Sequence, residues 1–305
     1  MKPVAILPGA TQAQGVHSTM LPGAGVSLHA LAAGQGTPLL LLHGFPDDSQ
    51  LWAPLLPTLA AQHQVLAPDL RGYGLSDKPT ELDCYRIDAL VADVLALIEH
   101  LGGRCALAGH DWGGMLAWVV AARHPQAVSR LAILNAPHPC RYAQQLVVDP
   151  AQRLASAYVQ RLCAPDAAAR LARDDFALLW SVITSSTAAS LSEAERAHSL
   201  ACWSRPGTLQ AMLNWYRALD MPAALAEGGV RALPDLGHAS GDIAVPTLML
   251  WGERDGSFPA ACLDGLARYV PQLSLRRFPE GGHWLLREQP EAVAAALLEF
   301  FADVS

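Results

Sequence analysis

Several patterns are scarce or missing in this chain of 305 residues. Basic residues are not in excess, because 21 lysines and arginines stand against 28 aspartates and glutamates, for a net charge of -7. A surface for nucleic acid or anionic lipid is therefore not expected. No apolar run approaches the roughly 20 residues that cross a bilayer, and the start of the sequence lacks the apolar region of a signal peptide. We expect a cytoplasmic protein with no membrane or nucleic-acid partner.

Motifs for metals and disulfides are missing too. The six cysteines form no CxxC pair, and the 11 histidines show no HExxH spacing. Such scattered thiols predict neither a zinc site nor a disulfide framework. We expect reduced, mostly buried cysteines and no metal or other cofactor.

Short apolar runs, by contrast, recur along the chain. Hydrophobic residues make up 51% of it and charged residues only 16%, which is ample for a sizeable core. Each run is closed by Gly, Pro, Asp or Asn, as expected of strands buried on both faces of a parallel sheet. These runs span residues 37–42, 64–67, 104–108, 131–134 and 246–251. Helix-length segments at 87–101 and 113–124 separate some of them, so the pattern predicts an α/β fold.

The pattern changes between residues 138 and 234. Ala, Arg, Leu and Trp recur there at helical spacing, and Pro165, Pro206 and Pro222 interrupt the helices. This region is predicted to be a helical insertion in the sheet domain. The expected division is a first core part at 1–137, a helical cap at 138–235 and a second core part at 236–305. A strand at 273–278 and a helix at 290–301 would complete the core.

The sequence GHDWGG, at residues 109–114, lies between an expected strand and an expected helix. A tight strand-to-helix turn of this kind exposes its middle side chain above the sheet, and flanking glycines let the helix approach the strand. The middle residue is Asp111. A lone G-x-D-x-G is also compatible with a plain N-cap carboxylate, so its meaning depends on the other motifs.

Three further segments supply the other groups that a hydrolase with a nucleophile at Asp111 would need. The backbone N–H groups of Phe45, in HGFP, and Trp112 could form an oxyanion hole. Asp255 ends an expected strand in WGERD, and His283 follows in GGHW, before the closing helix. Nucleophile, acid and histidine thus occur in the order typical of α/β-hydrolases.

From about Gly23 to its C terminus, the chain resembles the epoxide hydrolases of the α/β-hydrolase superfamily. The motifs that carry the resemblance are HGFP, PDLRGYGLSDKP (68–79), GHDWGG, LNAPHP (134–139), LNWYRAL (213–219), WGERD and GGHW. The resemblance implies an α/β-hydrolase core, mostly a parallel sheet flanked by helices, with an inserted helical cap and no cofactor. It implies that Asp111 opens an apolar epoxide to a vicinal diol through a covalent alkyl ester. Water activated by His283 and Asp255 would then hydrolyse the ester.

Ring opening needs a proton donor for the departing oxygen, and a phenol stays protonated at neutral pH. The family uses two cap tyrosines. Tyr216, in the segment NWYR, matches the downstream one closely, and Tyr158 lies a short distance before a proline, where the upstream one is expected.

Some residues near these motifs are candidate substrate contacts: Pro46, Met115, His138 and Trp284. Apolar and aromatic residues at helical spacing are also common in ordinary cores. His110, directly before Asp111, is expected to pack beneath the turn.

Three other functions share parts of this pattern. Haloalkane dehalogenases use the same aspartate nucleophile, but they grip halide with an asparagine where this chain has Phe45, and Trp112 does not discriminate. Fluoroacetate dehalogenases place arginines where this chain has Trp112 and Met115, which disfavours a small acid as substrate. A ligand-binding relative with little turnover would not need His283 and Asp255 together.

Asn135, where some relatives carry the triad acid, cannot serve as one. A monomer or a homodimer is expected.

Overall fold

A computed structural model describes residues 15–185, 187, 191–219 and 241–302. An eight-stranded sheet forms its centre, with the strand order β1-β2-β4-β3-β5-β6-β7-β8. Neighbouring strands from β4 to β8 in this order are parallel, whereas β2 is antiparallel to both β1 and β4. The strands are β1 (His17–Pro22), β2 (Ser27–Ala33), β3 (Thr37–Leu42), β4 (His63–Pro68), β5 (Cys105–His110), β6 (Val128–Leu134), β7 (Thr247–Gly252) and β8 (Leu273–Phe278). The predicted α/β class with a mostly parallel sheet is confirmed.

The central strands have the composition expected for a sheet covered on both faces. In β3 the four consecutive leucines 39–42 are all buried, and β5 and β7 are buried along their whole length. The five apolar runs therefore identified β3 to β7, and the separately expected strand at 273–278 is β8, so six of the eight strands were predicted.

The two N-terminal strands were not expected from apolar runs. β1 is mostly exposed, and β2 carries a buried histidine, His29, in place of an aliphatic residue. The ring of His29 lies 2.7 Å from both the Ser18 hydroxyl and the Asp69 carboxylate. Because this burial depends on partners from other parts of the chain, the local sequence carried no signal for it.

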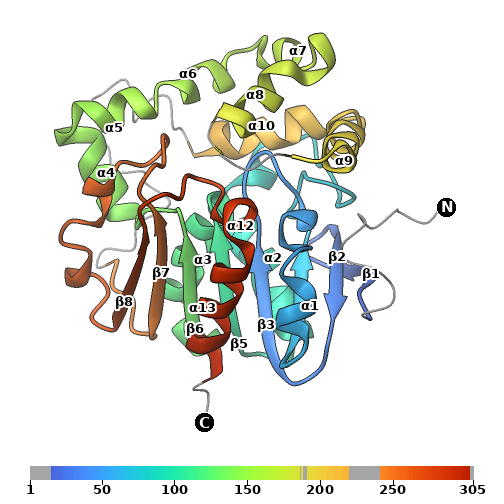
Figure 1. Cartoon of the computed structure of the whole chain (residues 1–305). Helices are drawn as coiled ribbons and strands as arrows, with labels where there is room; N and C mark the ends of the chain where they lie inside the picture. The colour runs from blue at the N-terminus through green and yellow to red at the C-terminus, as the bar shows by residue number, and fades with distance from the viewer. Residues whose placement is uncertain (1–14, 186, 188–190, 220–240, 303–305) are drawn as a thin grey trace.

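Helices cover both faces of the sheet (Figure 1). On one face α1 (Leu56–Ala60) and α13 (Pro290–Ala302) contact each other, with the short α12 (Leu285–Glu288) above them. On the other face α2 (Ile87–His100) packs against α3 (Trp112–Arg123). The expected helices at 87–101, 113–124 and 290–301 are present within one residue at each end.

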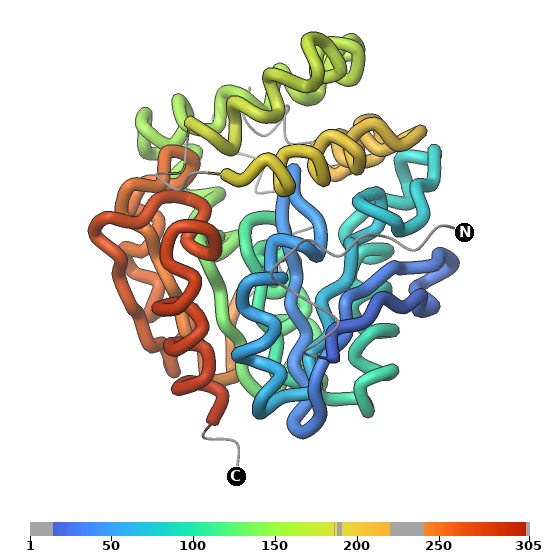
Figure 2. Tube along the Cα trace, turned by 45° about the vertical axis from the view of Figure 1, so that its right-hand side comes forward, coloured from blue at the N-terminus to red at the C-terminus, as the bar shows by residue number. Residues whose placement is uncertain are grey.

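A second helical layer lies over the carboxyl ends of the parallel strands, between β6 and β7 in sequence (Figures 1 and 2). It consists of α4 (Pro139–Val148), α5 (Pro150–Ala155), α6 (Tyr158–Cys163), α7 (Ala167–Leu171), α8 (Ala177–Ser185), α9 (Glu193–Trp203) and α10 (Thr208–Ala218). The proposed end of the cap, at residue 235, and Pro222 lie outside the described residues, so the domain boundaries stay a prediction. We call these seven helices the cap below.

Short 3-10 helices occur in the connections. They span Ser49–Trp52, Leu82–Tyr85, Pro125–Ala127, Asp174–Phe176, Ala260–Leu263 and Leu266–Arg268. Among the described helices, none has both the length and the apolar character needed to cross a bilayer.

Candidate active site

Asp111 lies in the turn between β5 and α3. Its backbone has φ 52° and ψ −122°, a conformation that costs energy for a residue with a side chain. The turn also needs close backbone contacts, because a Cβ at Gly109 would lie 2.4 Å from the Gly113 carbonyl oxygen, and one at Gly113 would lie 2.4 Å from the carbonyl oxygens of Leu42 and His43. The glycines of GHDWGG are therefore required for the tight turn that presents Asp111.

Backbone donors hold the Asp111 carboxylate. The Phe45 N–H donates to Oδ1 at 2.8 Å, and a hydrogen bond from the Trp112 backbone also favours the charged form. Gly44 makes room for this contact, since a Cβ there would lie 2.3 Å from Asp111 Oδ1. Burial raises the pKa of Asp111, but the hydrogen bond and charge of His283, together with the Trp112 donor, bring it below its usual value. The carboxylate is thus ionised and oriented.

His283 lies between Asp111 and Asp255. Its Nε2 is 3.5 Å from Asp111 Oδ2, and its Nδ1 is 2.8 Å from Asp255 Oδ2. Burial lowers the pKa of His283, but the charge of Asp255 and the contacts with Asp111 outweigh it and raise the pKa to about 10. The imidazole is therefore protonated between two carboxylates at neutral pH.

Asp255, just after β7, is held by three donors besides His283. Its Oδ1 accepts the backbone N–H groups of Ser257 at 2.7 Å and Phe258 at 3.1 Å. Its Oδ2 accepts the Asn135 side-chain amide at 2.7 Å. The sequence patterns did not predict this role of Asn135, because they bear only on whether residue 135 could be the triad acid. The available signal was an asparagine directly after the strand next to β7.

The two cap tyrosines meet above the nucleophile. Tyr216, on α10, is buried with its ring 5.0 Å from that of Trp112 and 5.4 Å from that of Phe45. The ring of Tyr158, at the start of α6, lies 6.4 Å from the ring of Tyr216. Burial, and then the negative charge of Asp111, raise the pKa of Tyr158 well above its usual value. Burial raises the pKa of Tyr216 in the same way, followed by the interaction with Tyr158 and then by the charge of Asp111. Both phenols are therefore kept protonated.

A cavity of about 600 Å³ joins these groups, which is a volume typical of small-molecule sites. Its residues come from the core and from α5 to α8 and α10 of the cap. The lining residues are Phe45, Asp111, Ala155, Tyr158, Arg161, Leu162, Ala167, Arg170, Leu171, Leu178, Leu179, Ser181, Val182, Ser185, Tyr216, Gly256, Ser257, His283 and Trp284. The predicted Trp284 contact is compatible with this lining. The contributions of α7 and α8, including Arg170, had no motif that could have indicated them.

Met115 and Trp112 line a second, much smaller cavity of about 20 Å³, which also borders Asp111 and both tyrosines. Met115 thus lies beside the nucleophile but is absent from the lining of the main cavity.

Two expected substrate contacts lie elsewhere. His138 caps α4, donates from Nε2 to the Gly241 carbonyl at 2.8 Å and stacks on the ring of Tyr269. Burial lowers its pKa to about 4, so it is neutral. The Pro46 carbonyl accepts a hydrogen bond from the Trp203 indole at 2.8 Å, and this proline borders a separate small cavity. Both residues therefore make structural contacts outside the lining of the main cavity, and a substrate contact by either stays a prediction.

His110 is buried beneath the turn, where its Nε2 donates to the His283 carbonyl at 2.9 Å. Burial, and then the charge of His283, lower its pKa to about 4. This neutral ring supports the loop that carries His283, in line with the expected packing role.

Comparisons with known proteins agree on one family. A family model described as the alpha/beta hydrolase fold matches residues 37–290. The AB hydrolase superfamily protein YfhM of Bacillus subtilis (strain 168) is 35% identical over 285 residues, covering 92% of this chain and 96% of that protein. Epoxide hydrolase 3 of Xenopus tropicalis is 34% identical over 307 residues, covering 96% of this chain and 80% of the relative.

A solved structure supports the same assignment. The crystal structure of Bacillus megaterium epoxide hydrolase in complex with an inhibitor superposes with a TM-score of 0.84 at 32% sequence identity, covering 93% of this chain and 100% of that one. The family predicted from the motifs is confirmed, and this chain belongs to the epoxide hydrolases of the α/β-hydrolase superfamily.

Proposed function

We propose that this protein opens an apolar epoxide to a vicinal diol through a covalent alkyl ester on Asp111. The observation that carries the proposal is the shared cavity. An ionised carboxylate, a histidine and two protonated phenols line it, and leucine, valine and alanine side chains form much of the remainder. These apolar walls favour a substrate with an apolar body.

In the first step, Oδ2 of Asp111 attacks an epoxide carbon, because Oδ1 is held by the Phe45 N–H. The carbon–oxygen bond of the ring breaks, and its electron pair goes to the ring oxygen. Tyr158 or Tyr216 transfers a proton to this oxygen, so that a hydroxyalkyl ester and a tyrosinate result. The tyrosinate then regains a proton from the His283 imidazolium.

In the second step, neutral His283 takes a proton from a water molecule, and the hydroxide attacks the carboxyl carbon of Asp111. The Phe45 and Trp112 N–H groups stabilise the tetrahedral intermediate. Collapse breaks the bond between the carboxyl carbon and the alkyl oxygen, and this oxygen takes the proton of the new carboxyl group and leaves as the diol. Asp111 returns as a carboxylate beside protonated His283. The sum is epoxide plus water to diol.

Intact-protein mass spectrometry of His283→Gln tests this sequence. The variant keeps the nucleophile and the phenols but lacks the base, so the ester should accumulate on incubation with styrene oxide. A mass increase of one whole epoxide, mapped to the peptide that contains Asp111, is expected. Asp111→Asn is the matched control and should give no adduct.

Incubation of His283→Gln with 1-bromobutane distinguishes the dehalogenase alternative. An adduct of the butyl group alone, with none from a panel of epoxides, would reassign the protein to dehalogenation. No adduct with either substrate class would contradict the covalent mechanism and favour a ligand-binding relative.

A further inference from the structure

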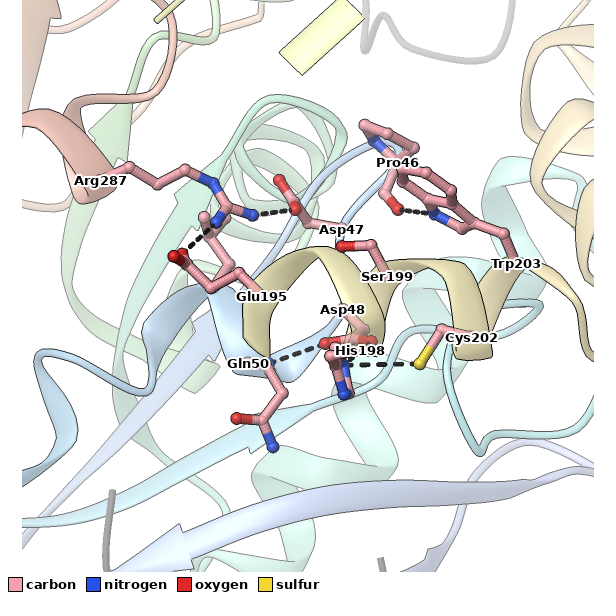
Figure 3. A pocket seen from close by; sticks show the side chains of 11 residues that line it. Pro46, Asp47, Asp48, Gln50, Glu195, His198, Ser199, Cys202, Trp203 and Arg287 are labelled. Carbon is pink, nitrogen blue, oxygen red and sulfur yellow. Dashed lines mark hydrogen bonds and ion pairs between the residues drawn. The ribbon is translucent and has the colours of Figure 1, made fainter. Parts of the chain in front are cut away.

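A second cluster of reactive side chains lies outside the proposed catalytic residues, between the core and the cap (Figure 3). Asp48 belongs to the loop that follows β3, three residues after the backbone donor Phe45. His198 and Cys202 are one turn apart on α9, so that they share a face of the cap helix. Asp48 Oδ2 lies 2.7 Å from His198 Nε2, and Cys202 Sγ lies 3.4 Å from the same nitrogen.

The three side chains are shielded from solvent. Asp48 and Cys202 are buried, and the side chain of His198 is 16% exposed. Their ligand atoms all lie within 4.8 Å of one another, and in the described part of the chain no other group of three or more His, Cys, Asp or Glu side chains meets this condition. The proposed reaction uses none of them.

This donor set matches a divalent transition metal. Zn²⁺ binds thiolate sulfur at roughly 2.3 Å, and imidazole nitrogen and carboxylate oxygen at about 2.0–2.2 Å, in tetrahedral geometry. Three protein ligands leave one position for water. A cavity of about 20 Å³ borders all three residues, and this volume is enough for one water molecule.

We propose that Asp48, His198 and Cys202 form a binding site for one Zn²⁺ or a similar ion that joins cap helix α9 to the loop carrying Phe45. In tetrahedral geometry with these bond lengths, Oδ2 would lie about 3.3 Å from Nε2 and Sγ about 3.6 Å from Nε2. The present separations are 2.7 Å and 3.4 Å, so the ion requires the carboxylate to move by about 0.6 Å and leaves the sulfur nearly in place. A bound ion would fix the cap against the loop whose Phe45 N–H donates to the Asp111 carboxylate.

Charge balance is compatible with this occupant. Without the ion, burial lowers the pKa of His198, but the nearby Asp48 carboxylate raises it above its usual value, and burial keeps Cys202 a neutral thiol. Binding of M²⁺ then displaces one proton from His198 and one from Cys202. The product, with one thiolate and one carboxylate, is again neutral. The other charged groups acting on the cluster are Asp47, Asp69 and Arg205.

Titration of the dialysed full-length protein with Co²⁺ tests the proposal. Tetrahedral Co²⁺ with a thiolate ligand should give intense visible d–d bands and a thiolate charge-transfer band, at one ion per chain. Cys202→Ser should abolish the charge-transfer band, and both Cys202→Ser and His198→Gln should weaken binding more than about 100-fold, since loss of a supporting partner alone costs 10–100-fold. Cys84→Ser, which removes a partly buried thiol outside the cluster, is the matched control and should bind as the wild type does.

Thermal unfolding with and without Zn²⁺ provides a second measurement that also reports whether each variant folds. An ion that binds only the folded state raises Tm. The rise should occur in the wild type and in Cys84→Ser and be absent from Cys202→Ser. Absence of both the cobalt bands and the zinc-dependent rise in the wild type would show that the cluster is only a buried ion pair. Bands unchanged in Cys202→Ser would place the ion elsewhere. Either result overturns the proposal.

Discussion

The charge of His283 depends in part on Asp111, the residue that the proposed reaction itself modifies. In the free protein, Asp255 and Asp111 together raise the pKa of His283 to about 10. Esterification of Asp111 removes one of these charges and one hydrogen bond. The pKa of His283 must therefore fall in the intermediate, which converts an imidazolium into a base at the stage where a base is needed.

This coupling predicts a pH dependence for ester hydrolysis. The rate should rise with pH through the pKa of His283 in the intermediate, because only the neutral imidazole accepts a proton from water. Asp255→Asn removes the remaining negative partner, so its acid limb should lie at lower pH, with a lower plateau because the ring loses its orienting acceptor. The decay of the ester in a single turnover, sampled by quenching and mass spectrometry at a series of pH values, measures the acid limb of the wild type and that of Asp255→Asn.

Asp88→Asn, at an exposed position on α2, is the control and should leave the profile in place. An acid limb at the same pH in Asp255→Asn and in the wild type would contradict the proposed coupling.

Phenylalanine at Tyr158 or Tyr216 should slow ring opening without slowing ester hydrolysis. A positioned proton donor contributes about 10²–10⁴-fold to a rate. Each single variant should lose part of this factor and the double variant most of it, measured as the rate of ester formation. Tyr85→Phe, a buried tyrosine bonded to the Pro79 carbonyl, is the control. Full activity in the double variant would disprove the assignment of both phenols.

At the scale of elements, the turn between β5 and α3 is the most constrained connection of the site. Helix α3 packs directly on β5, and this packing maintains the strained backbone conformation of Asp111. The exposed position of Asp111 therefore depends on close packing of α3 against β5, which leaves no space for a side chain between the two backbones.

Gly113→Ala tests this constraint. The new methyl group would lie 2.4 Å from two backbone carbonyl oxygens, which cannot move as a side chain can. Overpacking of this kind costs about 1–3 kcal/mol, and the upper end is expected here. Urea unfolding should show the loss. Gly256→Ala, where a Cβ has open space, should unfold with the wild type. Equal stability of Gly113→Ala would show that helix and strand can separate.

Elements differed in how well the sequence predicted them. β3, β5 and β7 were predictable because each is buried on both faces, so that apolar side chains follow one another without interruption. β1 and β2 were not, because β1 is exposed at the sheet edge and β2 buries a histidine against Asp69. The local pattern of hydrophobic residues indicates strands that are buried through apolar side chains. It does not indicate a buried polar side chain whose partner is far away in the sequence.

Across the whole molecule, charged contacts tie the cap to the core beside the active site. Arg287, on α12, contacts Asp47 of the loop after β3 and Glu195 of cap helix α9 (Figure 3). Asp47 also accepts the Trp284 indole N–H at 2.8 Å. The loop with Phe45, the segment with His283 and the cap therefore meet at Arg287, which forms both ion pairs.

Arg287→Ala should destabilise the protein by roughly 3 kcal/mol, because it leaves the Asp47 carboxylate buried without its cation. The rate of ester formation should fall as well, since Asp47 is two residues from the donor Phe45. Urea unfolding and single-turnover kinetics measure the two effects. Arg276→Ala, whose pair with Glu299 is exposed, should change stability by less than about 0.5 kcal/mol. Similar losses in both variants would mean that the buried pair has no special role.

The sequence by itself determined the family, the sheet class and the chain order of Asp111, Asp255 and His283. These follow from short motifs at strand ends, and parallel strands bring their carboxyl ends to one edge whatever the loops do. Tertiary structure alone decided that Asn135 holds Asp255, that His138 donates to the Gly241 carbonyl outside the main cavity, and that Asp48 contacts His198. Each of these contacts joins residues far apart in the chain, and neither periodicity nor motif spacing carries information about such a pairing.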